Sequence, residues 1–298
     1  MKRTIFFAAS IFALATLGMS FAHAQKKATA DDFQSIFYRV SGKGLAKPSY
    51  LFGTFHAVCS EDMVPFSTIG PYLDQTDQVV MEIALDDPAE LTSLATGLMM
   101  KDGKTLKDLL TPEQFAKVDE MTRNVLGRSA ENLKTIKPIM LSVMIITDAK
   151  MLGCAATQYD ISLMQLAAAK NKQLIGLETV AGQFAVMDGK PIATQAKELY
   201  EMAVDPQKAS RQIKELLSAY KSRDSEKLYE FSARQMADDK AFLKRILDDR
   251  NIAWLPRVET AIKAKPSLIA VGAAHLGGEK GLVRLLRTKG YQVTPVKL

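Results

Sequence analysis

Short, almost uninterrupted runs of apolar residues near both ends of the chain constrain the fold most. Residues 78–85 and 268–271 are the clearest examples. Runs without polar alternation are typical of strands that are covered on both faces, as in sheets that carry helices on each side. The same reasoning, together with turn residues at the boundaries, predicts further strands at residues 36–40, 49–52, 173–177 and 291–296.

The sequence between these strands predicts helices. Residues 111–114 (TPEQ) have the pattern of a capped helix start with proline at the first helical position. Asp205-Pro206 has the same combination of a capping residue and a proline. Residues 138–152 are apolar on nearly all sides, so we expect a buried helix that is too short to cross a bilayer. Strands near both ends and a long helical middle predict one α/β domain over residues 25–298, with a central mixed β-sheet that the C-terminal segment completes.

Residues 1–24 have the pattern of a secretory signal peptide. Lys2 and Arg3 form a charged start, a mostly apolar run follows, and a small-x-small pattern ends at Ala24, so cleavage is expected before Gln25. A membrane anchor is the alternative, but the apolar run is shorter than the roughly 20 residues that a span needs. The sequence therefore predicts a periplasmic or secreted protein with no stable membrane span after cleavage.

The charge of the chain does not indicate a nucleic-acid partner. Its formal net charge is +6, but the basic residues form no dense block. A single Trp and 7% aromatic residues also argue against stacking platforms for single strands. We therefore expect no nucleic acid among the partners.

The two cysteines, Cys59 and Cys154, have two interpretations. In an oxidising compartment they are expected to form one disulfide, whereas two buried, inert thiols are the alternative. Two cysteines cannot build a Cys-rich zinc site, and neither has the neighbour that a redox CxxC motif requires.

Two Gly-x-x-His segments are the main candidates for a functional site. Of the three histidines in the chain, one lies in the expected signal peptide, and the other two end residues 53–56 (GTFH) and 272–275 (GAAH). Each segment follows an apolar run, and ligands of open α/β sheets bind where strands end. We therefore expect His56 and His275 to face one site, as metal ligands or proton carriers. The pattern is short, so two hydrogen-bonded histidines with only a structural role are the alternative.

Two glutamates follow similar apolar runs and are candidates for the same site. Glu82 lies inside residues 78–85, where a charge is costly unless it is paired or bound to a metal. Glu178 follows residues 174–177. The plainer interpretations are a sheet-edge residue that reaches water or an Arg for Glu82, and a first-turn helix acid for Glu178. Two histidines and a carboxylate suit Zn, Mn, Fe or Co better than Ca. A metal-activated water would then hydrolyse an amide or ester, with a glutamate as general base.

These motifs together resemble the TraB/GumN family, whose members include relatives of the Tiki metalloproteases. The resemblance covers most of the chain after residue 24. It rests on residues 51–56 (LFGTFH), 80–82 (VME), 176–179 (GLET) with Gln183, Arg250-Asn251 with Trp254, 271–276 (VGAAHL), Gly281-Leu282 and 290–293 (GYQV).

The resemblance implies a site and a fold. By similarity to the Tiki branch, His56, His275 and Glu82 are expected to hold a divalent metal in a Tiki-like α/β fold. Glu178, Arg250 and Asn251 are further catalytic candidates by resemblance, with Arg250 holding a substrate carboxylate or stabilising an oxyanion.

For Arg250 and Asn251, the alternatives are a surface Arg and a helix-end Asn. The resemblance also concerns Asp160 and the two cysteines. Asp160 also matches the family, although an Asp before residues 161–170 is also expected simply to cap a helix. Exported relatives carry cysteines at corresponding places, which favours a Cys59–Cys154 disulfide.

The sequence thus leads to one main hypothesis and two rivals. The main one is a metal-dependent hydrolase of the peptidase type, which the histidines and glutamate favour and the resemblance implies. The chain contains no HExxH helix, P-loop or GxSxG elbow that would offer a rival chemistry. The first rival is a protein that binds a peptide, a metal or haem in the same cleft without turnover. The second is a histidine pair that only stabilises strand ends.

Overall fold

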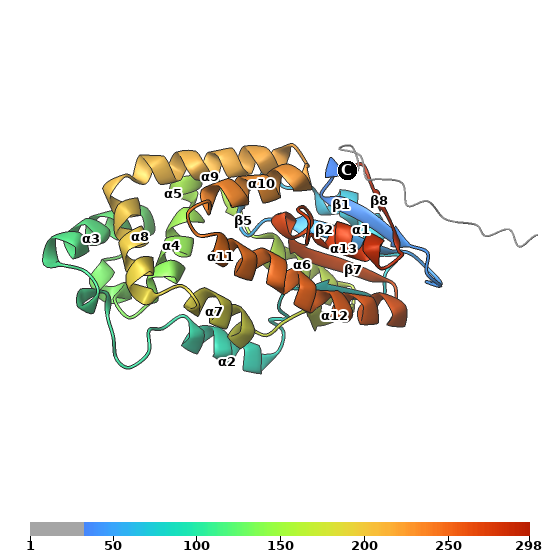
Figure 1. Cartoon of the computed structure of the whole chain (residues 1–298), viewed down its shortest axis with the longest axis horizontal. Coiled ribbons are helices and arrows are strands. Elements are labelled where there is room, and N and C mark those ends of the chain that lie inside the picture. The colour runs from blue at the N-terminus through green and yellow to red at the C-terminus, as the bar shows by residue number, and fades with distance from the viewer. Residues whose placement is uncertain (1–32) are drawn as a thin grey trace, which may run out of the picture.

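The computed structural model describes residues 33–298, and the expected signal peptide lies outside them. Six strands form one sheet in the order β6-β4-β7-β2-β1-β8 (Figure 1). The strands β6, β4, β7 and β2 run parallel, whereas β1 pairs antiparallel with both β2 and β8, so the expected α/β fold with a mixed sheet is confirmed. The strand bounds are β1 Phe37–Ser41, β2 Ser49–Thr54, β4 Gln78–Met81, β6 Gln173–Gly176, β7 Ser267–Gly272 and β8 Gln292–Pro295.

Each expected strand is present, and the largest difference concerns β4. This strand ends at Met81 instead of continuing to residue 85, so Glu82 is the first residue beyond it. There the backbone N–H of Gly272 donates to the Glu82 carboxylate at 2.8 Å rather than extending the ladder. Because β4 lies between β6 and β7, Glu82 is not the sheet-edge residue of the plainer interpretation.

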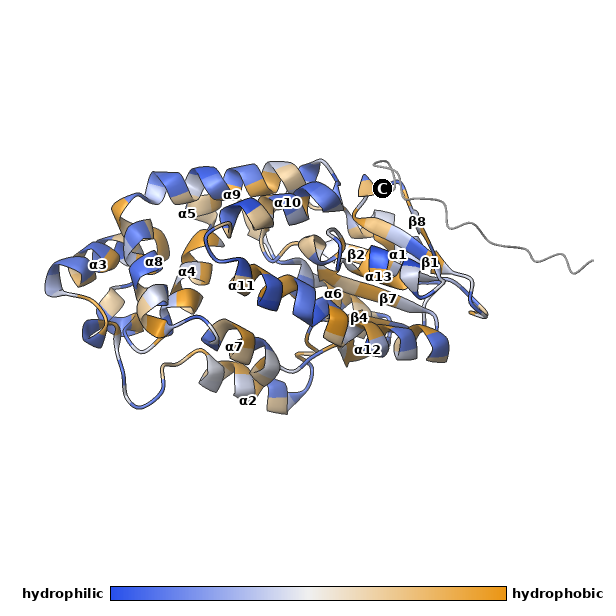
Figure 2. Ribbon diagram, viewed as in Figure 1, coloured by the Kyte–Doolittle hydropathy of each residue, from blue (hydrophilic) through white to orange (hydrophobic). Residues whose placement is uncertain are grey.

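Helices cover both faces of the sheet, which is why its strands are apolar throughout. One face packs against α1 (Phe66–Leu73), α6 (Tyr159–Ala169), α9 (Pro206–Lys221) and α10 (Ser225–Gln235). The other face packs against α12 (Arg250–Ala264) and α13 (Leu282–Thr288). Figure 2 shows the apolar strand β7 between these helices, whose polar sides face outward.

The helical middle of the chain forms its own apolar core beside the sheet (Figure 1). Residues 111–114 form the predicted capping box at the start of α3, and Asp205 caps α9 by accepting from Lys208 N at 2.9 Å. The predicted helix at 138–152 is two helices, because Asp148 caps a new one. The helix bounds here are α3 Pro112–Leu126, α4 Pro138–Ile146, α5 Ala149–Leu152 and α8 Ile192–Val204.

The remaining elements are short or lie beside the ends of the strands. Within residues 33–298, none of the helices combines the length and apolarity that crossing a bilayer requires. These elements are β3 Val58–Cys59, β5 Ala156–Thr157, α2 Pro88–Gly97, α7 Val180–Asp188, α11 Lys240–Leu243, the π-helix η4 Lys244–Asp249, and the 3₁₀ helices η2 Leu106–Asp108, η3 Ala130–Leu133 and η5 Ala273–His275.

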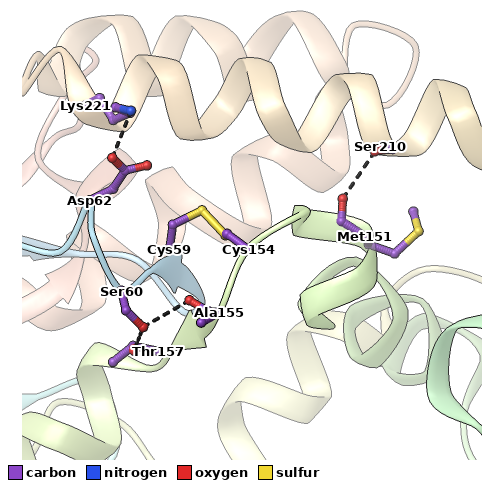
Figure 3. Close-up of a disulfide and its surroundings, with 9 residues drawn as sticks. All are labelled: Cys59, Ser60, Asp62, Met151, Cys154, Ala155, Thr157, Ser210 and Lys221. Carbon is purple, nitrogen blue, oxygen red and sulfur yellow. Dashed lines mark hydrogen bonds and ion pairs between the residues drawn. A yellow bond between two sulfur atoms is a disulfide. The ribbon is translucent and has the colours of Figure 1, made fainter.

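A disulfide joins Cys59 to Cys154, which confirms the pairing and rules out two inert thiols (Figure 3). It links the small ladder of β3 and β5, where Ser60 Oγ also donates to the Ala155 carbonyl at 3.0 Å. The strand β3 follows His56 in the chain, and β5 precedes α6. The disulfide therefore clamps the segment after His56 to the segment before α6.

Candidate functional site

The four parallel strands deliver their candidate side chains to one edge of the sheet. In the registers, Thr54 pairs with Gly272, Met81 with Ala270, and Met81 with Gly176. The carboxyl ends of these strands therefore lie side by side at one edge of the sheet, which is where ligands of open α/β sheets bind. The candidates follow at once: His56 after β2, Glu82 after β4, Glu178 after β6 and His275 at the end of η5.

Gly53 allows the end of β2 to lie very close to η5. A Cβ on Gly53 would lie 2.8 Å from the Cβ of Ala273, which is too close for any side chain. Glycine at this position therefore lets β2 lie against η5, the helix that carries His275.

Arg250 occupies the centre of the site. Its Nη2 donates to Glu82 Oε2 and to Glu178 Oε1, each at 2.6 Å, and its Nη1 donates to His275 Nε2 at 3.1 Å. The Arg250 side chain is only 7% exposed, and those of Glu82 and Glu178 are 12% and 14% exposed. The interpretation of Arg250 as a surface residue is therefore wrong, because Arg250 is buried and neutralises two buried carboxylates.

The position of Arg250 follows from the local helix geometry. It begins α12 directly after the π-helix η4, a rare wider turn that is often found at functional sites. Nη1 also donates to the Ile246 carbonyl at 3.0 Å, and the guanidinium lies 4.5 Å from the ring centroid of Trp254. The same Trp254 donates its indole N–H to Glu178 Oε2 at 3.1 Å. The guanidinium is thus held on several sides.

Asn251 fixes the tautomer of His275. The Asn251 amide nitrogen donates to the carbonyls of His275 and Lys280, at 3.1 and 2.9 Å, so its oxygen faces the imidazole. That oxygen lies 2.7 Å from His275 Nδ1, which must therefore carry the hydrogen. His275 Nε2 is left as an acceptor, and at present it accepts from Arg250. Asn251 is fully buried, so its role as a mere helix-end residue is also wrong.

Asp160 orients the second histidine. Its Oδ2 lies 3.0 Å from His56 Nδ1, and its Oδ1 accepts from the Thr54 hydroxyl at 3.3 Å. The helix α6 begins at Tyr159, with Gln158 at the N-cap, so Asp160 is not the cap that the sequence suggested. The His56 side chain is 67% exposed, unlike that of His275.

The charges of the site shift its pKa values in opposite directions. The hydrogen bond that His56 donates to Asp160 raises the pKa of His56 above its usual 6.5. Burial and the positive charge of Arg250 lower the pKa of His275 far below 6.5, so this ring is neutral. Burial alone would raise the pKa of Glu82, but Arg250, the two histidines and the Gly272 N–H together outweigh burial and hold that pKa below its usual 4.5.

The arrangement fits a divalent metal in part. His275 Nε2 and Glu82 Oε1 are 4.0 Å apart, wider than the roughly 3.4 Å between two ligand atoms of a tetrahedral ion bound at about 2.1 Å, so the two groups would have to move closer to share an ion. The expected third ligand, His56, does not lie within 4.8 Å of both of these atoms. In the described residues, the one set of three His, Cys, Asp or Glu side chains with ligand atoms that close together is Cys59, Glu61 and Cys154. Those cysteines form the disulfide and offer no thiolate.

Some contacts of the site were not expected from the residue types. Gln183 Nε2 donates to Glu82 Oε2 at 3.2 Å, and the Tyr220 hydroxyl donates to the Gly53 carbonyl at 3.1 Å. Gln183 and Trp254 entered the sequence analysis only through the resemblance. No sequence signal indicated Tyr220, because its partner is a backbone group from a distant strand.

A family model matches most of the chain. The model of the TraB/PrgY/gumN family covers residues 36–295, which include every candidate of the site. The chain belongs to this family. Its resemblance to the family, seen first in the strand-end motifs, is thereby confirmed.

The chain is also distantly similar to metalloproteases of the Tiki type. Metalloprotease TIKI2 of Danio rerio is 21% identical over 90% of this chain and 62% of its own length. Metalloprotease TIKI1 of Homo sapiens is 22% identical over 83% of this chain and 59% of its own length. The chain thus spans about 60% of the length of these relatives. No solved structure matches the chain.

Proposed function

We propose that this protein is a metal-dependent hydrolase that acts on peptides. The observation that carries the proposal is the pair of oriented imidazoles. Nδ1 of His56 faces Asp160 and Nδ1 of His275 faces Asn251, so Nε2 is the nitrogen of each ring that a metal would bind, once His56 loses its proton and Arg250 releases His275. Metal-binding histidines almost always have their other nitrogen fixed in this way. The distant relation to the Tiki metalloproteases supports the same class.

We assign the ligands to His275, Glu82 and His56. A divalent ion of the Zn, Mn, Co or Fe type would supply an activated water and polarise a carbonyl when bound. For His275 to bind it, Arg250 has to release Nε2, which frees the N–H of Nη1. We assign this N–H to the oxyanion of the substrate.

The other carboxylates and amides then have distinct tasks. Glu178 keeps Arg250 in place through two contacts to its Nη2 and Nε, and so positions the cation rather than the water. Glu82, with a carboxylate oxygen toward His275, is the candidate to hold the ion and accept a proton. Asn251 keeps His275 in the tautomer that binds.

We further propose that the protein acts in the periplasm or outside the cell. Residues 1–24 would direct export, and residues 25–298 would form one domain. The Cys59–Cys154 disulfide supports an oxidising compartment. The pairing of β1 with β8, strands from the two ends of the described chain, supports a single domain.

A peptide library tests the proposal. Protein loaded in turn with Mn, Co, Zn and Fe should cleave a subset of the peptides, and a chelator should abolish cleavage. His275→Gln should lose cleavage while Arg211→Gln, a change of an exposed arginine on α9, should retain it. Peptides that bind with measurable affinity but stay intact under every metal would replace the hydrolase with a binding protein.

A further inference from the structure

A cavity of about 360 Å³ lies directly beside the charged network of the site. It is formed by α7, by the π-helix η4 and by the first turns of α12, beyond the end of β6. Glu178, Arg250 and Trp254 belong both to its lining and to the network. A molecule in this cavity would therefore contact groups that also hold the candidate ligands in place.

The cavity lining has more positive charge than its carboxylates neutralise. Arg245 and Arg257 line it, and across residues 33–298 no carboxylate oxygen lies within 4.0 Å of either guanidinium. Both acidic residues of the lining are already paired: Glu178 binds Arg250, which also lines the cavity, and Asp249 binds Lys244. Two positive charges are thus left for a ligand.

Arg245 has a specific unmet hydrogen bond. Its Nε is buried and has no acceptor among the described residues, while its Nη2 reaches only the Gly189 carbonyl at 3.4 Å. A buried donor without an acceptor is costly. This nitrogen is enclosed by protein, so it marks a charge without a partner rather than the atom that a ligand in the cavity would contact. Arg257 is exposed, and its Nη1 donates to the Leu177 carbonyl at 2.7 Å, which directs this side chain along the cavity wall.

We propose that this cavity binds a carboxylate of the peptide substrate, with Arg245 as the anchor and Arg257 at the rim. The carboxylate is either the terminal one or that of an Asp or Glu side chain, since both offer the same two oxygens to a guanidinium. Leu177, Val186 and Ala253 supply an apolar wall for the carbon atoms of the bound residue. The inference rests on the proposed function, because it names the substrate class of that site.

The chain contains its own reporter for this cavity. Trp254 is the only tryptophan in the sequence and lines the cavity, so its fluorescence should respond when a ligand enters. Binding can therefore be measured without turnover. The result is then independent of whether the protein hydrolyses anything.

Three small ligands test the proposal on the whole protein. N-acetylleucine carries a terminal carboxylate, N-acetylglutamic acid α-amide carries only a side-chain carboxylate, and N-acetylleucinamide carries none. We expect at least one of the first two to change the fluorescence saturably, and the one that does so identifies the source of the carboxylate. Equal binding of the neutral amide, or no binding of either acid, would overturn the proposal.

Arginine variants identify the groups responsible. Arg245→Gln should weaken binding of the acid by roughly tenfold, as expected for the loss of one charge-assisted hydrogen bond. Arg257→Gln, an exposed change that should not disturb folding, should weaken it by a smaller factor of about threefold. Arg211→Gln on α9 is the matched control and should bind as the wild type does. Unchanged binding in both cavity variants would refute the assignment.

The two proposals fail separately in these experiments. If carboxylate binding is present but no peptide is cleaved under any metal, the subsite remains and the hydrolase is lost. If peptides are cleaved with no preference for a carboxylate, the hydrolase remains and the subsite is lost.

Discussion

Replacement of Arg250 by Met should destabilise the protein strongly at neutral pH. The substitution keeps much of the side-chain volume but leaves Glu82 and Glu178 as buried carboxylates without their cation. Removal of one partner from a buried ion pair costs about 3–5 kcal/mol, and little solvent screening is available because all three side chains are at most 14% exposed. We therefore expect a loss of about 3–5 kcal/mol in the free energy of unfolding at pH 7.5.

The same substitution should also reverse the effect of acid on these carboxylates. In the wild type the pKa of Glu82 is below 4.5, so its contribution to stability is present above pH 4.5 and is lost only at lower pH. Without Arg250, burial raises the pKa of Glu82 above 4.5. The folded variant then binds protons more readily than the unfolded chain, so its stability rises as the pH falls from 7.5 to 5.5. The deficit relative to wild type should therefore shrink.

Urea denaturation at pH 7.5 and 5.5 measures both effects. Arg211→Met, a change of an exposed arginine on α9, is the control and should stay within about 0.5 kcal/mol of wild type. A loss below about 1 kcal/mol for Arg250→Met, or an equal loss at the two pH values, would refute the idea that this cation neutralises two buried carboxylates.

Three further predictions concern the groups that orient the histidines. Loss of the disulfide in Cys59→Ser with Cys154→Ser opens a loop of 95 residues and should reduce the free energy of unfolding by about 4.7 kcal/mol, and a reduction under about 1 kcal/mol would contradict this. Asp160→Asn should lower the pKa of His56 toward 6.5 in an NMR titration, and an unchanged pKa would exclude Asp160 as the cause of the shift. Asn251→Leu should cost about 3 kcal/mol in a denaturation experiment, because it removes two buried hydrogen bonds and one that is partly buried, whereas an unchanged stability would contradict the role of Asn251.

The sheet and the convergence of its strand ends could be predicted from the sequence. Apolar runs located all six strands, and the parallel-sheet rule brought side chains from four strand ends to one edge. The end of β4 was missed because residues 83–85 are as apolar as the strand itself, so hydropathy cannot show where the ladder stops. The break between α4 and α5 was missed for a related reason, since Asp148 stands inside an otherwise apolar run.

The contacts inside the site could not be predicted in the same way. Sequence spacing gives no distance between Arg250 and the two glutamates, which come from strands about 70 and 170 positions earlier in the chain. For Asp160 the sequence left two interpretations open, a family position and a helix cap. Its actual partner, His56, is 104 positions away, and only the folded chain shows their contact.

Metal content is the most direct test of the central claim that two oriented imidazoles and Glu82 bind one divalent ion. The protein is dialysed against an equimolar mixture of Mn, Co, Zn and Fe and then examined by native mass spectrometry. We expect about one bound ion per chain in the wild type and in Arg211→Gln, and none in His275→Gln or His56→Gln. A wild type without any ion, or histidine variants that retain it, would contradict the account.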